Sequence, residues 1–304
     1  MKRAIVTGAN GFVGSAVVKE RSGHGVQVWA VVRNEASNIT SIEDFPNVHI
    51  VCCELSEIEQ LPQKISERGF DVFYHFAWEG VSGAARANAE LQTKNIYTTV
   101  NAVDTCARLQ CKRFVGIGTL AQYDCLAYAP EDGSQPLQTV CYASAKIAAH
   151  YMSKARCVSL EIEHIWTYLS NLYGLGDRSE NFINYAVECI RNSAHPAFTN
   201  GEQLYDFVDI SDTSRALLAI GERGHSLKSY YVGSGEARPL KEYIEILHQK
   251  IAPEKEIFLG EIPFHGRCLD GKVFDCSKLF LDTGFRAVVP FEVGIDRMLA
   301  GNRG

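Results

Sequence analysis

The chain of 304 residues lacks the features that mark several classes of protein. Its ten cysteines include no C-x-x-C pair, so the spacing typical of zinc or redox sites is absent. No apolar run approaches the roughly 18 residues that a membrane span needs, and the start, MKRAIVTGANG, has no signal-peptide core. We therefore expect a cytoplasmic protein without a metal site or a membrane segment, whose cysteines are mostly buried free thiols.

An excess of positive charge and a proline-rich linker are absent too. The net charge is -6, and Lys and Arg are scattered rather than clustered, so the sequence predicts no nucleic-acid or anionic-membrane partner. Only nine prolines occur, with no repeat or low-complexity tract, so no flexible linker is visible. With 46% hydrophobic residues, the chain can bury a substantial core.

Short β-branched runs alternate with segments of helical periodicity in the first half of the chain. The predicted strands are 3–7, 26–32, 48–52, 72–76, 113–117 and 161–168. The predicted helices lie near 12–18, 56–68, 86–109 and 141–156. Strand and helix in alternation indicate an α/β fold with a parallel sheet covered on both faces.

The alternation weakens after about residue 171. Helices are predicted at 181–192, 212–222 and 239–250, and strands at 204–210 and 256–259. This part could form a second, smaller lobe interwoven with the first.

A glycine turn follows the first predicted strand. In IVTGANGFVGSAVV the glycines are spaced G-x-x-G-x-x-G, one residue longer than the common dinucleotide fingerprint. Such spacing also occurs in ordinary tight turns, but a strand before it and a helix after it favour backbone amides approaching a pyrophosphate. The residues predicted to contact a dinucleotide here are Gly8, Asn10, Gly11, Phe12, Val13 and Gly14.

The end of the second strand, AVVRNEAS, bears on the choice of cofactor. An NAD site usually has an acidic residue here for the ribose 2′-hydroxyl, whereas a 2′-phosphate calls for arginine. Arg33 therefore favours NADP, although Glu35 could serve the ribose of NAD instead.

Tyr142 and Lys146 lie four residues apart in VCYASAK. Residues at this spacing are neighbours on any helix, so the spacing alone does not show that they form a catalytic pair. The surrounding stretches TGANGFVG, YHFAW, GIGTLAQY and YASAK resemble the extended short-chain dehydrogenase/reductase family of NAD(P)-dependent nucleotide-sugar epimerases, dehydratases and ketoreductases. NLYGLGD, GEQLYDFVDISD and RCLDGKVFDCSKL fit as well, so the resemblance spans nearly the whole chain.

The resemblance implies a Rossmann-type doubly wound parallel sheet with a smaller, interwoven C-terminal substrate lobe. We expect residues 1–168 to form the dinucleotide-binding domain, with roughly 203–234 returning to it. Residues 169–202 and 235–304 would then form the substrate lobe. The family commonly dimerises through the helices that correspond to 86–109 and 141–156, so a homodimer is expected.

The resemblance also implies that Thr119, Tyr142 and Lys146 are catalytic. Tyr142 would exchange a proton with a sugar hydroxyl or ketone, and Thr119 would hydrogen-bond the same oxygen. Lys146 would bind the nicotinamide ribose. Since an unperturbed phenol has a pKa near 10, we expect the Lys146 ammonium, together with a cationic nicotinamide, to lower the pKa of Tyr142.

Other positions resemble those of the family less specifically. Trp78 stands where a small residue is usual, Asn95 matches an asparagine whose role looks structural, and His75 is expected to be a core histidine. The further predicted cofactor contacts are Glu54, Leu55, Phe76, Ala77, Trp78 and Asn95. The further predicted substrate contacts are Arg86, Asn171, Asn181, Tyr205 and Arg267, with Tyr205 standing where the family often has arginine.

The residues after Thr119 narrow the choice among the family's reactions. Family members that are 4,6-dehydratases typically carry Asp-Glu there, whereas this chain has Leu120 and Ala121, which cannot move a proton. Arg33 then favours an NADPH-dependent reductase of a nucleotide-linked 4-keto-6-deoxy sugar. The alternatives are an NAD-dependent nucleotide-sugar 4-epimerase and a non-catalytic NADP-binding regulator.

Overall fold

The computed structural model describes residues 1–128, 140–266 and 268–301. A seven-stranded sheet with the order β11-β6-β5-β4-β1-β2-β3 forms its centre, and every pairing in it is parallel. Its strands are β1 (Arg3–Thr7), β2 (Gln27–Val32), β3 (Val48–Cys52), β4 (Val72–His75), β5 (Arg113–Thr119), β6 (Glu163–Leu169) and β11 (Ser229–Val232). The strand order reverses between β1 and β4, as in doubly wound folds, so the predicted fold class is confirmed.

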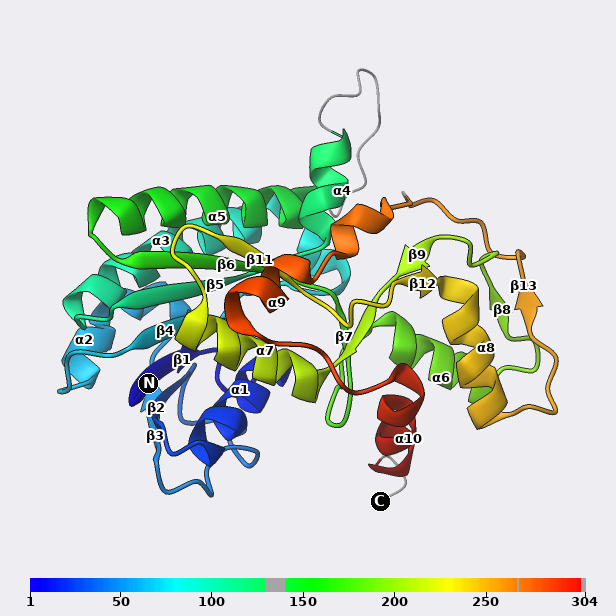
Figure 1. Cartoon of the computed structure of the whole chain (residues 1–304), viewed down its shortest axis with the longest axis horizontal. Helices are drawn as coiled ribbons and strands as arrows, with labels where there is room; N and C mark the ends of the chain where they lie inside the picture. Colours follow the sequence, from blue (N-terminus) through cyan, green and yellow to red (C-terminus); the bar gives the residue numbers. More distant parts are fainter. Residues whose placement is uncertain (129–139, 267, 302–304) are drawn as a thin grey trace.

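Helices cover both faces of the sheet (Figure 1). α1 (Phe12–Gly23) and α7 (Ile210–Arg223) pack together on one face, while α3 (Ala89–Arg108) and α5 (Val140–Ser159) pack together on the other. Successive β1 side chains serve opposite faces: Ala4 and Val6 join the core under α1 and α7, and Ile5 joins the core under α3 and α5. Burial on both faces explains the continuous apolar character of β1 and β2.

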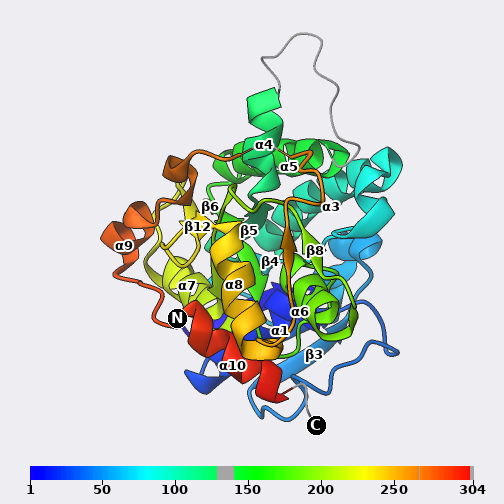
Figure 2. The same cartoon turned by 90° about the vertical axis from the view of Figure 1, so that its right-hand side faces the viewer.

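A third core lies beside the central sheet, between helices that face the viewer in Figure 2. It is built by α6 (Phe182–Asn192), α8 (Leu240–Ile251) and α10 (Phe291–Gly301) around buried aromatic side chains such as Phe207, Tyr243 and Phe291. Three small two-stranded sheets accompany these helices. They pair β7 (Asn171–Tyr173) with β10 (Phe207–Asp209), β9 (Leu204–Tyr205) with β12 (Arg238–Pro239), and β8 (Ala197–Phe198) with β13 (Phe258–Leu259).

Several elements differ from the sequence prediction. The helix predicted near 56–68 is a 3₁₀ turn, η1 (Leu55–Gln60), followed by a short α2 (Leu61–Lys64). The strand predicted at 204–210 is broken between β9 and β10, because the carboxylate of Asp206 is buried there and accepts hydrogen bonds from Tyr231 Oη (2.7 Å) and Ser234 N (3.1 Å).

One helix of the region 235–304, which is predicted to belong to the substrate lobe, contacts the central sheet. α9 (Ser277–Thr283) packs against α7 and β11, and Leu279 belongs to a core of the central sheet. α4 (Ala121–Tyr128) and the 3₁₀ turns η2 (Gly83–Ala87) and η3 (Gly271–Phe274) complete the described elements. The lobe boundaries stay a prediction. None of the described helices combines the length and apolar character required to cross a bilayer.

Candidate active site

The glycine turn between β1 and α1 brings two backbone segments too close together for side chains. Gly8 has φ +65°, and a Cβ there would lie 2.9 Å from Ala77 N in the segment after β4. A Cβ on Gly14 would overlap the carbonyl oxygen of Gly8. Glycine at both positions therefore leaves the backbone bare where a pyrophosphate approaches the start of a helix, which fits a dinucleotide cofactor.

A cleft of about 540 Å³ opens at this turn, along the carboxyl ends of the parallel strands. Ligands of open α/β sheets bind at this edge, where the strand order reverses. The predicted residues that line it are Gly8, Asn10, Gly11, Phe12, Val13, Gly14, Arg33, Leu55, Phe76, Ala77, Trp78, Thr119, Tyr142 and Lys146. Lining residues that the sequence reasoning missed include Val31, Cys53, Ile58, Glu79, Gly118 and Ser170. Val31 and Gly118 lie within AVVRNEAS and GIGTLAQY, which could have signalled them, whereas the other four belong to no motif.

The three predicted catalytic residues meet in this cleft. Thr119 is the last residue of β5, and Tyr142 and Lys146 lie one turn apart on α5. The Thr119 hydroxyl hydrogen-bonds Tyr142. Tyr142 and Lys146 are both buried, and Lys146 Nζ donates to the carbonyl oxygen of Ile117 at 2.8 Å. The three side chains that the sequence grouped together thus line one space.

Burial sets the pKa values of this group. It raises the pKa of Tyr142, and the Arg86 guanidinium and the Thr119 hydrogen bond oppose that rise. Burial also lowers the pKa of Lys146 to about 7. The expected lowering of the Tyr142 pKa, which also involves a cationic nicotinamide, stays a prediction.

Trp78 occupies the space beside Lys146. Its ring face lies 3.7 Å from Lys146 Nζ, and its ring meets that of Tyr142 edge-on with 6.2 Å between centroids. Trp78 Nε1 donates to Gln92 Oε1 at 2.9 Å, which fixes the ring orientation. Gln92, buried on α3, was missed by sequence reasoning because nothing in its local pattern distinguishes it from a surface residue.

Two predicted cofactor contacts lie outside the cleft wall. Asn95 is buried in α3 and makes two hydrogen bonds with the backbone of Glu79, from Glu79 N (3.0 Å) and to Glu79 O (2.8 Å). It therefore shapes the segment after β4, in line with the expected structural role. Glu54 precedes η1, and its backbone carbonyl accepts a hydrogen bond from Glu57 N at 3.0 Å.

His75 is a core histidine, as the sequence suggested. Its Nδ1 lies 3.0 Å from Thr7 Oγ1 and its Nε2 lies 3.4 Å from Thr99 Oγ1, so both ring nitrogens have partners. Burial, with a smaller contribution from Lys146, lowers the pKa of His75 to about 3. The ring is therefore neutral near pH 7 and unsuited to proton transfer there.

The predicted substrate contacts are spread over several elements. Arg86 covers the ring of Tyr142, with 4.6 Å between its guanidinium carbon and the ring centroid. Asn181 caps α6, accepting from Asn184 N at 2.9 Å and donating to the Leu172 carbonyl at 3.1 Å. Asn171 lies on β7 and Tyr205 on β9. Arg267 is outside the described residues.

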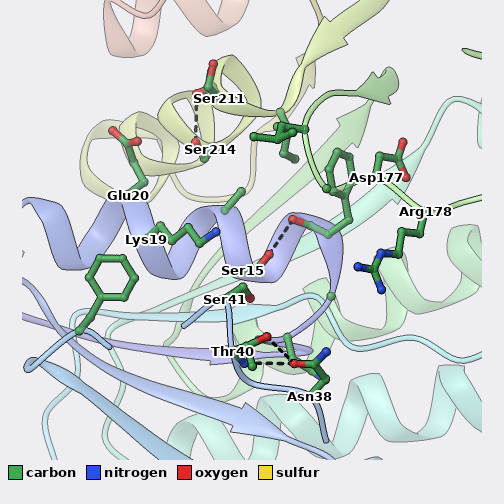
Figure 3. A pocket seen from close by; sticks show the side chains of 18 of the residues that line it. Ser15, Lys19, Glu20, Asn38, Thr40, Ser41, Asp177, Arg178, Ser211 and Ser214 are labelled. Carbon is green, nitrogen blue, oxygen red and sulfur yellow. Dashed lines mark hydrogen bonds between the residues drawn. The ribbon is translucent and has the colours of Figure 1, made fainter. Parts of the chain in front are cut away.

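A larger hollow, of about 870 Å³, runs beside α1 (Figure 3). It shares Asn10, Gly11 and Phe12 with the cleft, but none of the three catalytic residues lines it. Its charged side chains come in both signs, Lys19 and Glu20 from α1 and Asp177 and Arg178 from the segment after β7 (Figure 3). We place the active site in the smaller cleft because the reactive groups converge there.

Comparison with known proteins identifies the family of the chain. Residues 4–233 match the model of the NAD-dependent epimerase/dehydratase family, which covers more than half of the chain. The chain belongs to this family. The matched range includes the glycine turn, Thr119, Tyr142 and Lys146.

Relatives within the family differ in their reactions. The chain is 25% identical to CDP-abequose synthase of Salmonella typhimurium, over 82% of this chain and 81% of that protein. It is 24% identical to dTDP-glucose 4,6-dehydratase of Streptomyces griseus (80% and 76%) and 22% identical to dTDP-4-dehydro-6-deoxyglucose reductase of Escherichia coli (98% and 97%). The Bordetella bronchiseptica enzyme WbmF in complex with NADH shares the fold, with a TM-score of 0.79 and 18% identity over 99% of this chain and 92% of that one.

Proposed function

We propose that the protein is an NADPH-dependent reductase of a nucleotide-linked 4-keto-6-deoxy sugar. The observation that carries this proposal is the proton chemistry at the end of β5. Tyr142, hydrogen-bonded to Thr119, can exchange one proton, whereas Leu120 and Ala121 supply no second acid or base. One proton donor suffices to reduce a ketone, but elimination of water from the sugar requires more.

The raised pKa of Tyr142 suits reduction. Burial keeps the phenol protonated near neutral pH, which is the state a proton donor needs. When bound, the nicotinamide cofactor supplies a hydride to the carbonyl carbon. Thr119 holds the carbonyl oxygen by a hydrogen bond, and the Tyr142 hydroxyl gives its proton to that oxygen. The bare backbone at Gly8 and Gly14 would hold the pyrophosphate of the cofactor.

Arg33 supports NADPH over NADH. It lies in the cleft wall at the end of β2, where a 2′-phosphate would be recognised, and Glu35 does not line the cleft. Arg33 is exposed and makes an ion pair of 3.2 Å with Glu79, so its guanidinium is accessible from the cleft mouth. An exposed pair of this kind contributes little stability, and Arg33 can therefore exchange Glu79 for a phosphate.

We also propose a cytoplasmic homodimer. The outward faces of α3 and α5 carry exposed Tyr97, Tyr151, Met152 and Val158, an unusual concentration of large apolar side chains on two adjacent helices. All ten cysteines are free thiols, which suits a reducing compartment.

We also propose that Asn171, Asn181 and Tyr205 contact the substrate.

The deciding experiment incubates the protein with NADPH and a panel of nucleotide-linked 4-keto-6-deoxy sugars while absorbance at the NADPH band is followed. We expect stoichiometric loss of NADPH, abolished in Tyr142→Phe and retained in Tyr151→Phe, an exposed tyrosine of the same helix. Cofactor binding should survive in both variants, because the phenol acts in proton transfer.

The other outcomes identify the alternatives. Interconversion of nucleotide sugars without loss of NADPH, sustained by bound NAD, would indicate a 4-epimerase. Tight cofactor binding with neither reaction would indicate a regulator. Normal turnover in Tyr142→Phe would contradict the proposed mechanism.

A further inference from the structure

The chain passes from a strand to a helix directly after Thr119, which is the last residue of β5. The backbone amide of Thr119 donates a hydrogen bond to the side chain of Gln122 on α4, with 3.1 Å between Thr119 N and Gln122 Oε1. In return, Thr119 Oγ1 accepts a hydrogen bond from Ala121 N at 3.3 Å. The stretch Thr-Leu-Ala-Gln therefore resembles a capping box, in which a glutamine of the first helical turn reaches back to the amide of a threonine.

The Gln122 side chain is buried. It is 1% exposed, and its Oε1 accepts a second hydrogen bond from Trp166 Nε1 at 3.3 Å. Trp166, also 1% exposed, lies on β6, which pairs with β5. A capping side chain at a surface can exchange its partner for water, whereas a buried N–H that loses its acceptor stays unsatisfied at a cost. The Gln122 amide is therefore held in one place by two donors.

Two glycines of β5 make the space for this contact. A Cβ on Gly118 would overlap both Gln122 Oε1 and Trp166 Nε1. A Cβ on Gly116 would overlap the Trp166 ring. A glycine within a strand often marks a place where another group approaches the backbone closely. The glycines of GIGT thus belong to the same packed unit as Gln122 and Trp166.

This unit borders the active-site cleft without opening into it. Gly118 and Thr119 line the cleft, and the Thr119 hydroxyl hydrogen-bonds Tyr142. Gln122 is not among the described residues that line the cleft. Any effect of Gln122 on the reaction must therefore act through Thr119.

We propose that Gln122 is the positioning residue for Thr119, because its side-chain oxygen fixes the Thr119 amide and thereby the place of the Thr119 hydroxyl beside Tyr142. The inference rests on the proposed function, in which Thr119 hydrogen-bonds the carbonyl oxygen that Tyr142 protonates. A misplacement of about 1 Å at a reacting group can lower the rate about hundredfold. With its amide fixed by Gln122, the threonine is ordered before the substrate binds.

Other contacts of α4 hold the helix but not the threonine amide. Cys125 Sγ lies 3.4 Å from Ser144 Oγ on α5. The rings of Tyr123 and Tyr168 pack with 4.9 Å between their centroids, which joins α4 to β6. These contacts remain when the Gln122 side chain is changed, so α4 keeps its place and the effect of a substitution falls on the turn at Thr119.

The test compares variants at Gln122 in the NADPH assay. Gln122→Met keeps the length of the side chain and removes its oxygen, and we expect it to lower kcat roughly tenfold to hundredfold while the Kd for NADPH stays within about twofold. Gln122→Glu retains an acceptor and should recover most of kcat. Trp166→Phe should lower kcat less than Gln122→Met does, because the Thr119 amide keeps its acceptor.

A matched control separates positioning from loss of stability. The Thr283 hydroxyl on α9 is buried, donates to Leu279 O at 2.6 Å and accepts from Phe285 N at 3.2 Å. Thr283→Val therefore removes two hydrogen bonds, as Gln122→Met does, and it should lower the melting temperature but leave kcat unchanged. An unchanged kcat in Gln122→Met, an equal fall in Thr283→Val, or no recovery in Gln122→Glu would overturn the proposal.

A second measurement needs no substrate. The full-length protein is labelled with ¹⁵N-threonine and its amide hydrogen exchange is followed by NMR, with the Thr119 signal identified by its loss in Thr119→Val. We expect a protected Thr119 amide in the wild type, and exchange at least about tenfold faster in Gln122→Met but not in Thr283→Val. An unprotected amide in the wild type, or unchanged exchange in Gln122→Met, would refute this inference. A protein that reduces none of the sugars would refute only the proposed function.

Discussion

Arg33 and Glu79 face each other at the mouth of the cofactor cleft, with 3.2 Å between Arg33 Nη2 and Glu79 Oε1. The side chains are 62% and 42% exposed, so solvent screens the pair and its net stabilisation is about 0–1 kcal/mol. The Asn95 side chain holds the backbone of Glu79 by two hydrogen bonds. Only the Glu79 carboxylate therefore has to move when Arg33 binds a phosphate.

This pair makes the cofactor preference testable at the residue scale. Arg33→Ala should raise the Kd for NADPH by roughly tenfold or more and that for NADH much less, because only NADPH carries the 2′-phosphate. Glu79→Gln should lower the Kd for NADPH a few-fold by removing the competing carboxylate. Titration of the intrinsic fluorescence with each cofactor measures both constants. Equal effects of Arg33→Ala on the two cofactors would contradict the preference.

Around Tyr142, local sequence and tertiary contacts have separate effects. Four-residue spacing on α5 brings Tyr142 and Lys146 to the same side of the helix. The direction of the Lys146 ammonium, however, depends on Trp78 and the Ile117 carbonyl, which belong to other segments. Spacing could therefore predict which residues meet, but not the contacts that the Lys146 ammonium makes.

At the scale of elements, the turn between β1 and α1 depends on close backbone approach. Gly11 N donates to Gly8 O at 3.0 Å, and Gly14 sits in the first turn of α1 against that same carbonyl. The turn is therefore a compact unit in which α1 begins directly over the end of β1. A side chain at Gly14 would push the helix away from the strand.

Gly14→Ala should weaken NADPH binding by more than tenfold and lower the free energy of unfolding by about 1–3 kcal/mol, because overpacking against backbone cannot be relieved by a rotamer change. Gly23→Ala is the matched control on the same helix, since a Cβ there meets nothing within 4 Å. Chemical denaturation and cofactor titration of both variants measure the difference. A normal Kd for NADPH in Gly14→Ala would contradict this expectation, because it would show that the turn between β1 and α1 can accommodate a side chain and still bind the cofactor.

The helices illustrate how caps complement periodicity. Asn88 caps α3 by accepting from Leu91 N, and Asp209 caps α7 by accepting from Ser211 N. Asn181, predicted as a ligand of the substrate, uses its side chain in the same way on α6. The sequence signal for a cap and for a polar ligand is the same residue type, so the residue type by itself does not separate the two roles.

At the scale of the whole molecule, the outer faces of α3 and α5 contrast with the opposite side of the sheet. There α7 is covered in part by α9. On the α3 and α5 side, Tyr97 is 67% exposed and Tyr151 is 61% exposed. Burying such rings against a second copy would remove apolar area from water, at roughly 25 cal/mol per Å².

We expect the protein to sediment as a dimer and the double variant Tyr97→Glu with Tyr151→Glu to sediment as a monomer, because two buried carboxylates would lose their solvation at the interface. Leu281→Glu, which changes a side chain that is 79% exposed on α9, should remain dimeric. Sedimentation velocity over a range of protein concentrations measures this. A monomeric wild-type protein, or a dimer unaffected by the double change, would rule out this interface.

The sequence by itself determined the alternating strands and helices and the glycine turn, because each depends on local spacing along the chain, and its family resemblance grouped Thr119, Tyr142 and Lys146 as the predicted catalytic residues. Tertiary structure alone decided the break at Asp206, the packing of α9, and the arrangement of Trp78, Gln92 and Arg86 around Tyr142. These features arise between segments distant in sequence. Their geometry depends on which buried groups form hydrogen bonds or pack against each other in the folded chain, and no local sequence pattern predicts those contacts.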